Sequence, residues 1–330
     1  MQFRGTNVWA VFVSLSETFE REEFDMQQIR KGSSKTVLGT DVPGQCIIDD
    51  SGETSVLDYG PIPGFKSRRV AQARLSQMRS FFTLLHRRGI PTHVIILDDR
   101  RGILVREVQV QDLPLLSPPA PDTPRQVGTE VLIRLRISKK FLERIKRGEV
   151  DLNQIVLAEG EELTVGARLA VPYVEFSAKW IKGDPYLSDE QAMEIGELDS
   201  TELQTLRGFA TRVGSIVAEF VSGCDYLPVD FKIEVAVDPR TGGFIMIDAL
   251  TLDEMGLIYR AEQYGKNPLR SYYELKHPEW LISFKTAVNA GLPKAEWPKM
   301  PSLPVEVMQS HEDRYTWAAQ DFARHLDSVT

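Results

Sequence analysis

A pair of apolar strands with charges on one face constrains this chain more than any other feature. The segment 227–250, LPVDFKIEVAVDPRTGGFIMIDAL, contains two strand-like runs separated by a turn. Because strand side chains alternate between faces, Asp230, Lys232 and Glu234 point to the same side, and apolar residues lie between them. Asp248 ends the second apolar run. The pattern predicts a buried hairpin whose charged face lines a cleft.

The charges of this hairpin suit a site for a divalent cation and a phosphate group. Glu234 and Asp248 can meet across the predicted ladder, and Mg²⁺ bound to a nucleotide commonly uses one or two protein carboxylates. Lys232 lies on the face of Glu234 and can neutralise a phosphate or a developing charge. The competing interpretation is a solvated strand face with an ion pair worth less than ~1 kcal/mol. The apolar flanks favour the lined cleft.

Composition and charge exclude several classes of protein. The chain has 330 residues, of which 42% are hydrophobic and 26% charged, enough for two lobes and a large core. Its net charge of −8 argues against a nucleic-acid or anionic membrane surface. Its two cysteines give no disulfide framework, and no apolar run approaches the ~20 residues of a membrane span. We therefore expect a cytoplasmic protein without nucleic-acid or membrane partners.

The order of helical and strand patterns predicts an α+β fold. Strand patterns lead the first half and helical patterns dominate the second, which indicates a small antiparallel β-rich N-terminal lobe and a larger mixed α+β lobe. A long helix is predicted from 66 to the stop signal at Gly89, and further helices over 139–148 and 188–222. The expected divisions are an N-terminal extension at 1–28, the small lobe at 29–112, a Pro-rich linker or insert at 113–128 and the larger lobe at 129–330.

A glycine-serine turn before a strand provides a candidate phosphate loop. RKGSSKTVL places Gly32 and Ser33 in the turn and Lys35 at the start of the strand. Backbone N–H groups followed by a lysine can hold phosphate oxygens. Such turns are also common as purely structural features, so the motif gains weight only from its context.

Two other clusters carry groups that bind anions. Arg134 and Arg136 share one face of the strand TEVLIRLRIS, and planar guanidinium groups suit phosphate or carboxylate. Lys179 and Asp184 lie in AKWIKGDP, just before a helix with capping-box spacing. Exposed arginines on an edge strand and a polar loop are the structural alternatives. The sequence contains no GxSxG, HExxH, GxxxxGK[ST] or HRD–DFG motif, so the hydrolase, zinc-protease, P-loop and protein-kinase patterns are missing.

Taken in order, these motifs resemble the SAICAR synthetase family, the phosphoribosylaminoimidazole-succinocarboxamide synthases. KGSSKTVL is similar to the family's glycine-lysine loop, and IPGFKSRRVAQARLSQMRSFFTLLHRRGIPTHVI to its Ile-Pro-Gly-Lys-Gly segment, long helix and Gly-Ile-Pro. The run from Glu130 to Arg134 resembles the Glu-x-x-x-Arg strand. DFKIE matches the family's Asp-x-Lys-x-Glu, and Asp248 represents the aspartate of a following Asp-Glu. The resemblance covers about residues 29 to 259.

The resemblance implies a two-lobed, kinase-like fold with ATP between the lobes. It implies a ligase that couples a carboxylate to the amine of aspartate, cleaves ATP to ADP and phosphate, and requires Mg²⁺. The residues implied for catalysis are Lys232 and Asp230, and those for the metal are Glu234 and Asp248. The nucleotide-binding set is Gly32, Ser33, Lys35, Glu107 and Lys232. The substrate-binding set is Arg134, Arg136, Ser138, Lys179, Asp184 and Asp253.

The chain departs from the family pattern mainly at the expected substrate end. Ala249 follows Asp248 where the family has glutamate, and TLDEMG keeps Asp253 but has Gly256 in place of an arginine. Losing an arginine that binds an anion costs roughly 1.5–3 kcal/mol if the ligand is unchanged.

The main hypothesis is therefore a ligase that joins a carboxylate on a nucleotide or nucleoside-like heterocycle to aspartate or another amino acid, in a specialised nucleoside or nucleotide pathway. The ordinary purine-pathway reaction, a kinase-like phosphotransferase and a non-catalytic nucleotide-binding protein stay as alternatives. A homo-oligomer stays open.

Overall fold

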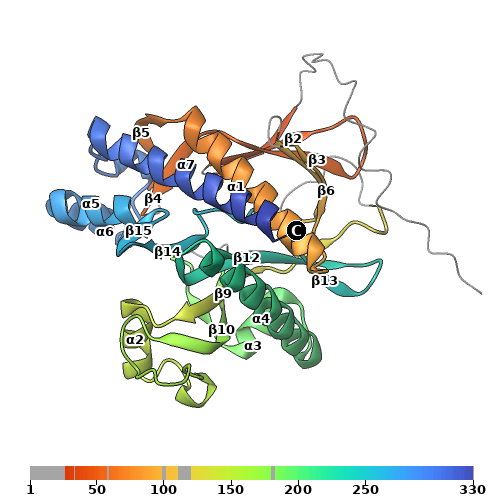
Figure 1. Cartoon of the computed structure of the whole chain (residues 1–330). Coiled ribbons are helices and arrows are strands. Elements are labelled where there is room, and N and C mark those ends of the chain that lie inside the picture. The colour runs from red at the N-terminus through yellow and green to blue at the C-terminus, as the bar shows by residue number, and fades with distance from the viewer. Residues whose placement is uncertain are drawn as a thin grey trace, which may run out of the picture.

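Two antiparallel sheets lie on either side of the middle of the molecule in a computed structural model (Figure 1). The structure describes residues 27–32, 34–57, 59–98, 102–110, 120–179 and 183–329. The expected N-terminal extension lies almost wholly outside these residues, as does much of the Pro-rich segment. The predicted divisions of the chain at 28, 112 and 128 therefore stay predictions.

The smaller sheet is built from the first third of the chain. Its strand order is β1 (Gln28–Lys31), β2 (Lys35–Gly39), β3 (Gln45–Asp50), β7 (Gly102–Arg106) and β6 (Val94–Asp98). A separate two-stranded ribbon joins β4 (Glu53–Val56) to β5 (Gly60–Lys66). The long helix α1 (Arg68–Arg87) follows, capped at its start by the Ser67 side chain, which accepts from the Val70 N–H. Gly89 lies just past its end with a φ of 68°, so the predicted helix and its stop are confirmed.

The larger sheet comes from the second half of the chain. Its order is β11 (Tyr186–Leu187), β10 (Arg168–Ala178), β9 (Thr129–Arg136), β12 (Leu227–Asp238), β14 (Met255–Tyr259) and β15 (Glu262–Tyr264), with β8 (Arg125–Gln126) and β13 (Gly243–Ile247) also paired to β12. All pairings among these strands are antiparallel. The α+β class predicted from the sequence is confirmed.

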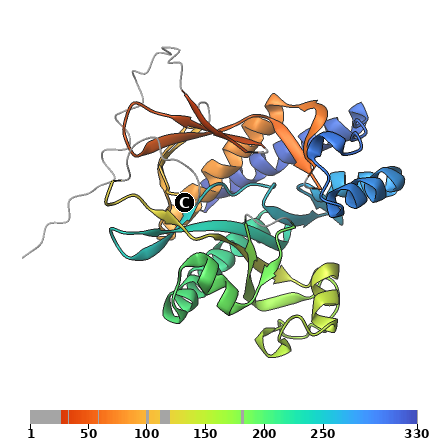
Figure 2. The ribbon, with the colours of Figure 1, turned by 180° about the vertical axis from the view of Figure 1, so that it is seen from behind.

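The helices of the second half differ from the prediction at one point. Helix α2 (Lys139–Lys146) matches the first predicted helix. The second is two helices, α3 (Asp189–Gly196) and α4 (Ser200–Gly223), because Glu197 takes a left-handed conformation with a φ of 51°. Asp199 then restarts the helix through a capping box with Glu202. Helix α4 packs against β9, β10 and β12 (Figure 2).

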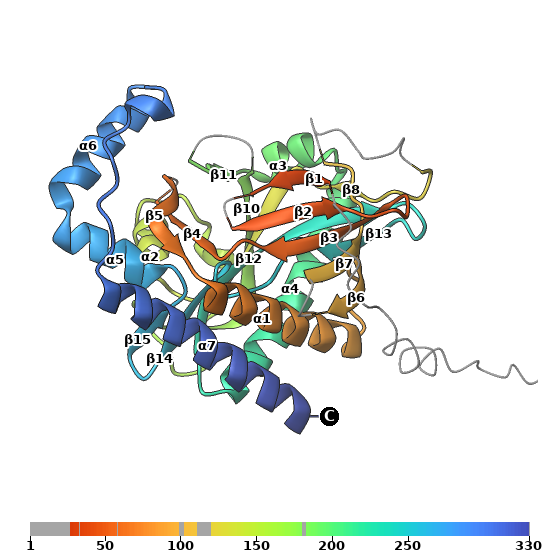
Figure 3. The same cartoon turned by 90° about the horizontal axis from the view of Figure 1, so that it is seen from above.

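The last helix returns to the first half of the chain. Helix α7 (Val305–Ser328) lies alongside α1, whereas α5 (Asn267–Lys276) and α6 (Pro278–Asn289) project to one side (Figure 3). The contact includes a hydrogen bond of 3.0 Å from Gln77 Nε2 of α1 to the Tyr315 carbonyl of α7. Among the described residues, no helix combines the length and the apolar content needed to cross a membrane.

The charged hairpin has the form predicted from its alternation. Strands β12 and β13 pair with Glu234 opposite Ile247. The side chains of Phe231 and Ile233 are buried on one face, while Lys232 and Glu234 are half-buried on the other. One face of the hairpin therefore belongs to the core and the other is available to a site.

Two glycines of α4 test how tightly this helix packs against the larger sheet. A Cβ on Gly214 would lie 2.7 Å from Ile133 Cγ2 and 3.1 Å from Pro172 Cβ, whereas a Cβ on Gly208 meets nothing within 4 Å. We expect Gly214→Ala to lower the free energy of unfolding by about 1–3 kcal/mol through overpacking. Gly208→Ala should raise it by about 0.5–1 kcal/mol, since alanine favours a helix interior. Urea denaturation of both variants measures the difference, and equal effects would refute this packing.

Candidate functional site

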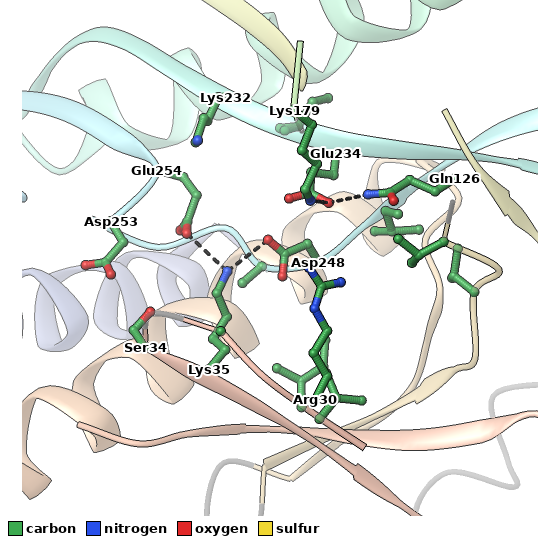
Figure 4. A pocket seen from close by; sticks show the side chains of 18 of the residues that line it. Arg30, Ser34, Lys35, Gln126, Lys179, Lys232, Glu234, Asp248, Asp253 and Glu254 are labelled. Carbon is green, nitrogen blue, oxygen red and sulfur yellow. Dashed lines mark hydrogen bonds and ion pairs between the residues drawn. The ribbon is translucent and has the colours of Figure 1, made fainter. Parts of the chain in front are cut away.

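A cavity of about 590 Å³ lies between the smaller sheet and the hairpin of the larger sheet. Part of its wall is apolar and comes from Val37, Cys46, Ile48, Val108 and Ile247. The rest is densely charged. In Figure 4, Arg30 and Lys35 reach into the cavity from the smaller sheet, and Lys179, Lys232 and Glu234 face them from the larger one.

A lysine bridges two carboxylates at the centre of this cavity. Lys35 Nζ lies 2.9 Å from Asp248 Oδ2 and 3.2 Å from Glu254 Oε1 (Figure 4). Beside this bridge, Lys179 forms an ion pair with Glu234, and Gln126 Nε2 donates to Glu234 Oε2 at 2.6 Å. The lysines come from both sheets, whereas the carboxylates come from the hairpin and the loop that follows it. Together, Lys35, Lys179, Glu234, Asp248 and Glu254 form the central charge row of the cavity.

Local backbone features place the carboxylates. Asp248 directly follows β13 and has a left-handed φ of 63°, which aspartate tolerates better than most residues. Glu254 is fixed because its Oε2 accepts from both the Thr251 N–H and the Thr251 hydroxyl at 2.8 Å. The Leu252 N–H donates to Gln77 Oε1 of α1 at 2.9 Å, which ties this loop to the first half of the chain.

Burial and neighbouring charges shift the pKa values of Glu234 and Asp248 in opposite directions. Burial and the adjacent Asp248 charge raise the pKa of Glu234 to about 7, despite the opposing effect of Lys179. Burial would also raise the pKa of Asp248, but Lys35 and Lys179 outweigh it and hold that pKa well below its usual value. Two close carboxyls that ionise at different pH can share one proton. A divalent cation can replace that proton.

Lys232 lines the cavity and is paired with a carboxylate of the neighbouring strand. Its Nζ donates to Glu130 Oε1 of β9 at 2.7 Å. Burial would lower the pKa of Lys232, but the charges of Glu130, Asp184 and Glu254 outweigh it and raise that pKa. The lysine is therefore a stable cation in the lining of the cavity.

Arg134 is held in a buried network away from the cavity wall. Its Nη1 donates to Asp230 Oδ2 at 2.8 Å, its Nε to Glu175 Oε1 at 2.6 Å and its Nη2 to the Tyr186 hydroxyl at 3.0 Å. Burial would lower the pKa of Arg134, but Glu175 and Asp230 outweigh it and raise that pKa. Asp230 and Arg134 thus bind each other in this structure.

Asp253 anchors the loop that carries Glu254. It accepts from Arg74 Nε at 3.2 Å and from the Tyr315 hydroxyl at 2.5 Å, and pairs with Lys266 Nζ at 3.0 Å. Burial would raise the pKa of Asp253, but Arg74 and Lys266 outweigh it and lower that pKa strongly. Arg74 also pairs with Asp50 at 3.2 Å, so one buried arginine connects α1, β3, the 251–254 loop and α7.

The structure brings most of the expected site residues together. Those that line the cavity are Gly32, Lys35, Glu107, Lys179, Asp184, Lys232, Glu234, Asp248 and Asp253. Four are outside its lining: Asp230 and Arg134 in their own network, Arg136 on the Gly166 carbonyl, and Ser138 as the N-cap of α2. Ser33 lies outside the described residues. The roles assigned to all of these residues stay predictions.

Several cavity residues were missed by the sequence analysis. Glu254 stands next to Asp253 in TLDEMG, and its acidity was the available signal. Gln126 lies in the Pro-rich stretch, where no pattern marked it. Lys266 comes from the turn before α5 and His93 from the segment after α1. Only the tertiary fold places these four side chains in the lining of one cavity.

The arrangement suits a cation bound together with phosphate groups. Within the described ranges, no group of three or more His, Cys, Asp or Glu side chains could hold a metal ion by itself. The pair Glu234 and Asp248 supplies two hard oxygen donors, which matches Mg²⁺ that keeps its other positions for phosphate and water. Lys35, Lys179 and Lys232 supply positive charge for phosphate oxygens.

Comparison with known proteins identifies relatives across most of the chain. The sequence profile of the SAICAR synthetase family matches residues 28–280. A relative from Archaeoglobus fulgidus is 29% identical over 291 residues, which cover 80% of this chain and 84% of the relative. The phosphoribosylaminoimidazole-succinocarboxamide synthase of Synechocystis is 28% identical over 234 residues, 70% of this chain and 74% of that enzyme.

Solved structures share the fold at low sequence identity. SAICAR synthase from Saccharomyces cerevisiae, complexed with SAICAR, has a TM-score of 0.61 at 16% identity and covers 93% of this chain and 98% of its own. The synthase from Ehrlichia chaffeensis has a TM-score of 0.59 at 18% identity, with 84% and 100% covered. The predicted two-lobed fold of this family is therefore confirmed.

The buried arginine of α1 provides a test of what holds the site together. Arg74 is 1% exposed, and replacing it with methionine removes the cation that pairs with Asp50 and one of the two that pair with Asp253. We expect Arg74→Met to lower the free energy of unfolding by about 3–5 kcal/mol. Arg69 on the same helix also pairs with α7, through Glu312 and Asp313, but is 52% exposed. Arg69→Met should cost less than ~1 kcal/mol. Denaturant titration of both variants is the measurement, and a mild effect at Arg74 would contradict the network.

Proposed function

The chain belongs to the SAICAR synthetase family, and on that premise we propose that it joins the carboxylate of a phosphoribosylaminoimidazole to the amine of aspartate. Membership makes it an ATP-dependent ligase that forms an amide bond. The curated relatives favour this ordinary reaction over the specialised pathway that the departures from the family pattern indicated. ATP and the two coupled compounds are the proposed substrates, and Mg²⁺ is the proposed cofactor.

The central charge row is the observation that carries the proposal. A carboxylate is a poor electrophile, and transfer of a phosphoryl group from ATP makes it an acyl phosphate that an amine can attack. Lys35 and Lys179 approach the same two carboxylates from opposite sheets. A triphosphate between the sheets can take over these lysines, while Glu234 and Asp248 hold Mg²⁺. When bound, the cation neutralises phosphate oxygens during transfer.

Other cavity residues have roles that follow from their position. Lys232 lines the cavity, where it can bind the carboxylate or the transferred phosphoryl oxygens. Asp253 keeps Glu254 against Lys35 and does not itself require a ligand, because its partners are protein side chains.

A diverged acceptor substrate is the second candidate, and one contact favours it. Gly256 of β14 lies opposite Asp230 in the ladder, and a Cβ there would come within 2.7 Å of Asp230 Oδ1. A side chain at position 256 would therefore displace Asp230 from Arg134. The family pattern has an arginine at position 256. This chain has Gly256 there, and the nearby Asp230 is already paired with Arg134. Its acceptor substrate would therefore bind through side chains other than that arginine.

The reaction itself is tested by product analysis. We expect ADP and inorganic phosphate to appear only when ATP, Mg²⁺, the phosphoribosylaminoimidazole carboxylate and aspartate are all present. Lys35→Met should lower the rate by about 100-fold or more, because it removes the central cation from the phosphate site. Lys31→Met is the matched control, since Lys31 pairs with Glu53 outside the cavity lining and should keep the rate within about twofold.

The assay also separates the competing functions. Turnover with another heterocyclic carboxylate or another amine, but not with the ordinary pair, would establish the diverged acceptor. Phosphate attached to a product would indicate a phosphotransferase. ATP binding without turnover on any pair would contradict the ligase proposal.

The raised pKa of Glu234 predicts a pH-dependent metal affinity. Mg²⁺ needs the ionised carboxylate, so binding of Mg²⁺ with ADP should release the proton that Glu234 holds near neutral pH. Affinity should rise about tenfold between pH 6 and pH 8 and level off above that range. Calorimetry in buffers of different ionisation enthalpy measures the released proton. Glu234→Gln should bind more weakly and lose the pH dependence; constant wild-type affinity over this range would contradict the shift.

A further inference from the structure

Two side chains in the cavity wall keep buried polar atoms that have neither a hydrogen-bond partner nor an ion pair among the described residues. They are His93, through both Nδ1 and Nε2, and Gln126, through Oε1. His93 is 3% exposed and Gln126 is 5% exposed, so bulk water has little access to either. Buried polar groups are almost always paired in folded proteins, and exceptions call for a ligand or a bound water.

The ring of His93 is held firmly in place. The backbone N–H of His93 donates to the Met246 carbonyl of β13 at 3.1 Å, and the backbone carbonyl of His93 accepts from the Arg106 N–H of β7 at 2.8 Å. The imidazole packs edge-on against Phe82 of α1, with 5.9 Å between the ring centroids. Burial lowers the pKa of His93 to about 4, so the ring is neutral and offers one donor and one acceptor.

Gln126 is oriented by the carboxylate beside it. Its Nε2 donates to Glu234 Oε2 at 2.6 Å, and a carboxylate oxygen accepts from the amide nitrogen but not from the amide oxygen. The amide cannot turn over without losing this bond. Gln126 Oε1 is therefore left as a fixed acceptor, which can be satisfied only by a hydrogen-bond donor.

The surroundings of these atoms fit a flat, partly apolar ligand. Ile247 packs with Ala236 and Ile245 in a small cluster of its own, and Val108 lies against that cluster. Across the cavity, Val37, Cys46 and Ile48 supply apolar surface from the smaller sheet. The apolar wall adjoins the charge row at Lys35, and a nucleotide has this same division into a planar base and a charged phosphate chain.

We propose that His93 and Gln126 bind the nucleoside moiety of the nucleotide whose phosphates lie at Lys35. The imidazole hydrogen-bonds to the edge of the base, and Gln126 Oε1 accepts from a nucleoside donor, either the exocyclic amine or a ribose hydroxyl. The same Gln126 amide would then contact the nucleoside through Oε1 and Glu234, a proposed metal ligand, through Nε2. This inference rests on the proposed ATP site and adds the residues that distinguish one nucleotide from another.

The experiment compares ligands that differ only in the nucleoside. ADP and inorganic tripolyphosphate, each with Mg²⁺, are titrated into wild-type protein, His93→Phe and Gln126→Met by calorimetry. Each variant should bind ADP about three- to tenfold more weakly, the usual effect of one lost hydrogen bond. Binding of tripolyphosphate should change by less than about twofold in His93→Phe, and should fall less than binding of ADP in Gln126→Met, where Glu234 also loses a hydrogen bond. His86→Phe is the matched control, because His86 bonds to Thr92 outside the cavity lining and should leave both affinities unchanged.

Analogues then identify the donor that Gln126 accepts from. If it is the exocyclic amine, wild-type protein binds IDP more weakly than ADP, while Gln126→Met binds both alike. If it is a ribose hydroxyl, 2′-deoxy-ADP or 3′-deoxy-ADP gives this pattern instead. Either pattern supports the proposal.

Two results would overturn the assignment while leaving the ATP site intact: unchanged affinity for ADP in both variants, or equal losses for ADP and tripolyphosphate. A wild-type protein that binds no ADP would instead contradict the proposed function, and this inference with it.

Discussion

The contact on which the site depends is the bridge from Lys35 to Asp248 and Glu254. It joins the smaller sheet to the loop that follows the hairpin of the larger sheet, so it holds together the two walls of the cavity. Because all three groups are largely removed from water, the ion pairs are strong only while their geometry is maintained. A ligand with its own negative charge competes for the lysine, and a cation competes for the carboxylates. In the proposed function, binding of the two together would replace the bridge without leaving a buried charge unpaired.

Two buried ion-pair networks, around Arg74 and around Arg134, lie next to this bridge. Arg74 neutralises Asp50 and Asp253, and Asp253 begins the turn that presents Glu254 to Lys35. The Arg134 network has the opposite character, because its carboxylates are satisfied within the protein. The same kinds of residue therefore serve two purposes. In the proposed function, those between the sheets exchange their protein partners for a ligand, whereas those of the Arg74 and Arg134 networks keep theirs.

Alternation and turn signals were enough to predict the hairpin, the helix α1 and the α+β class, because each depends on residues close in sequence. They also placed Lys35, Lys232, Glu234 and Asp248 in one site, with the help of the family pattern. Sequence could not reveal that Arg134 turns toward Asp230, since that depends on the register of β9 against β12. Nor could it reveal His93 and Gln126, because only the folded chain shows that their buried polar atoms lack hydrogen-bond partners. Contacts between distant segments decide these cases.

The return of α7 to α1 has a consequence for how the protein is made. The Tyr315 hydroxyl of α7 completes the hydrogen bonding of Asp253, although Asp253 belongs to a loop synthesised 62 residues earlier. A ribosome has therefore already produced both sheets before the helix that stabilises their connection is available. Until then, Arg74 and Asp253 are exposed to solvent on that side and α1 lacks its apolar cover. The support that Asp253 receives from Tyr315 is therefore gained only after α7 has been synthesised.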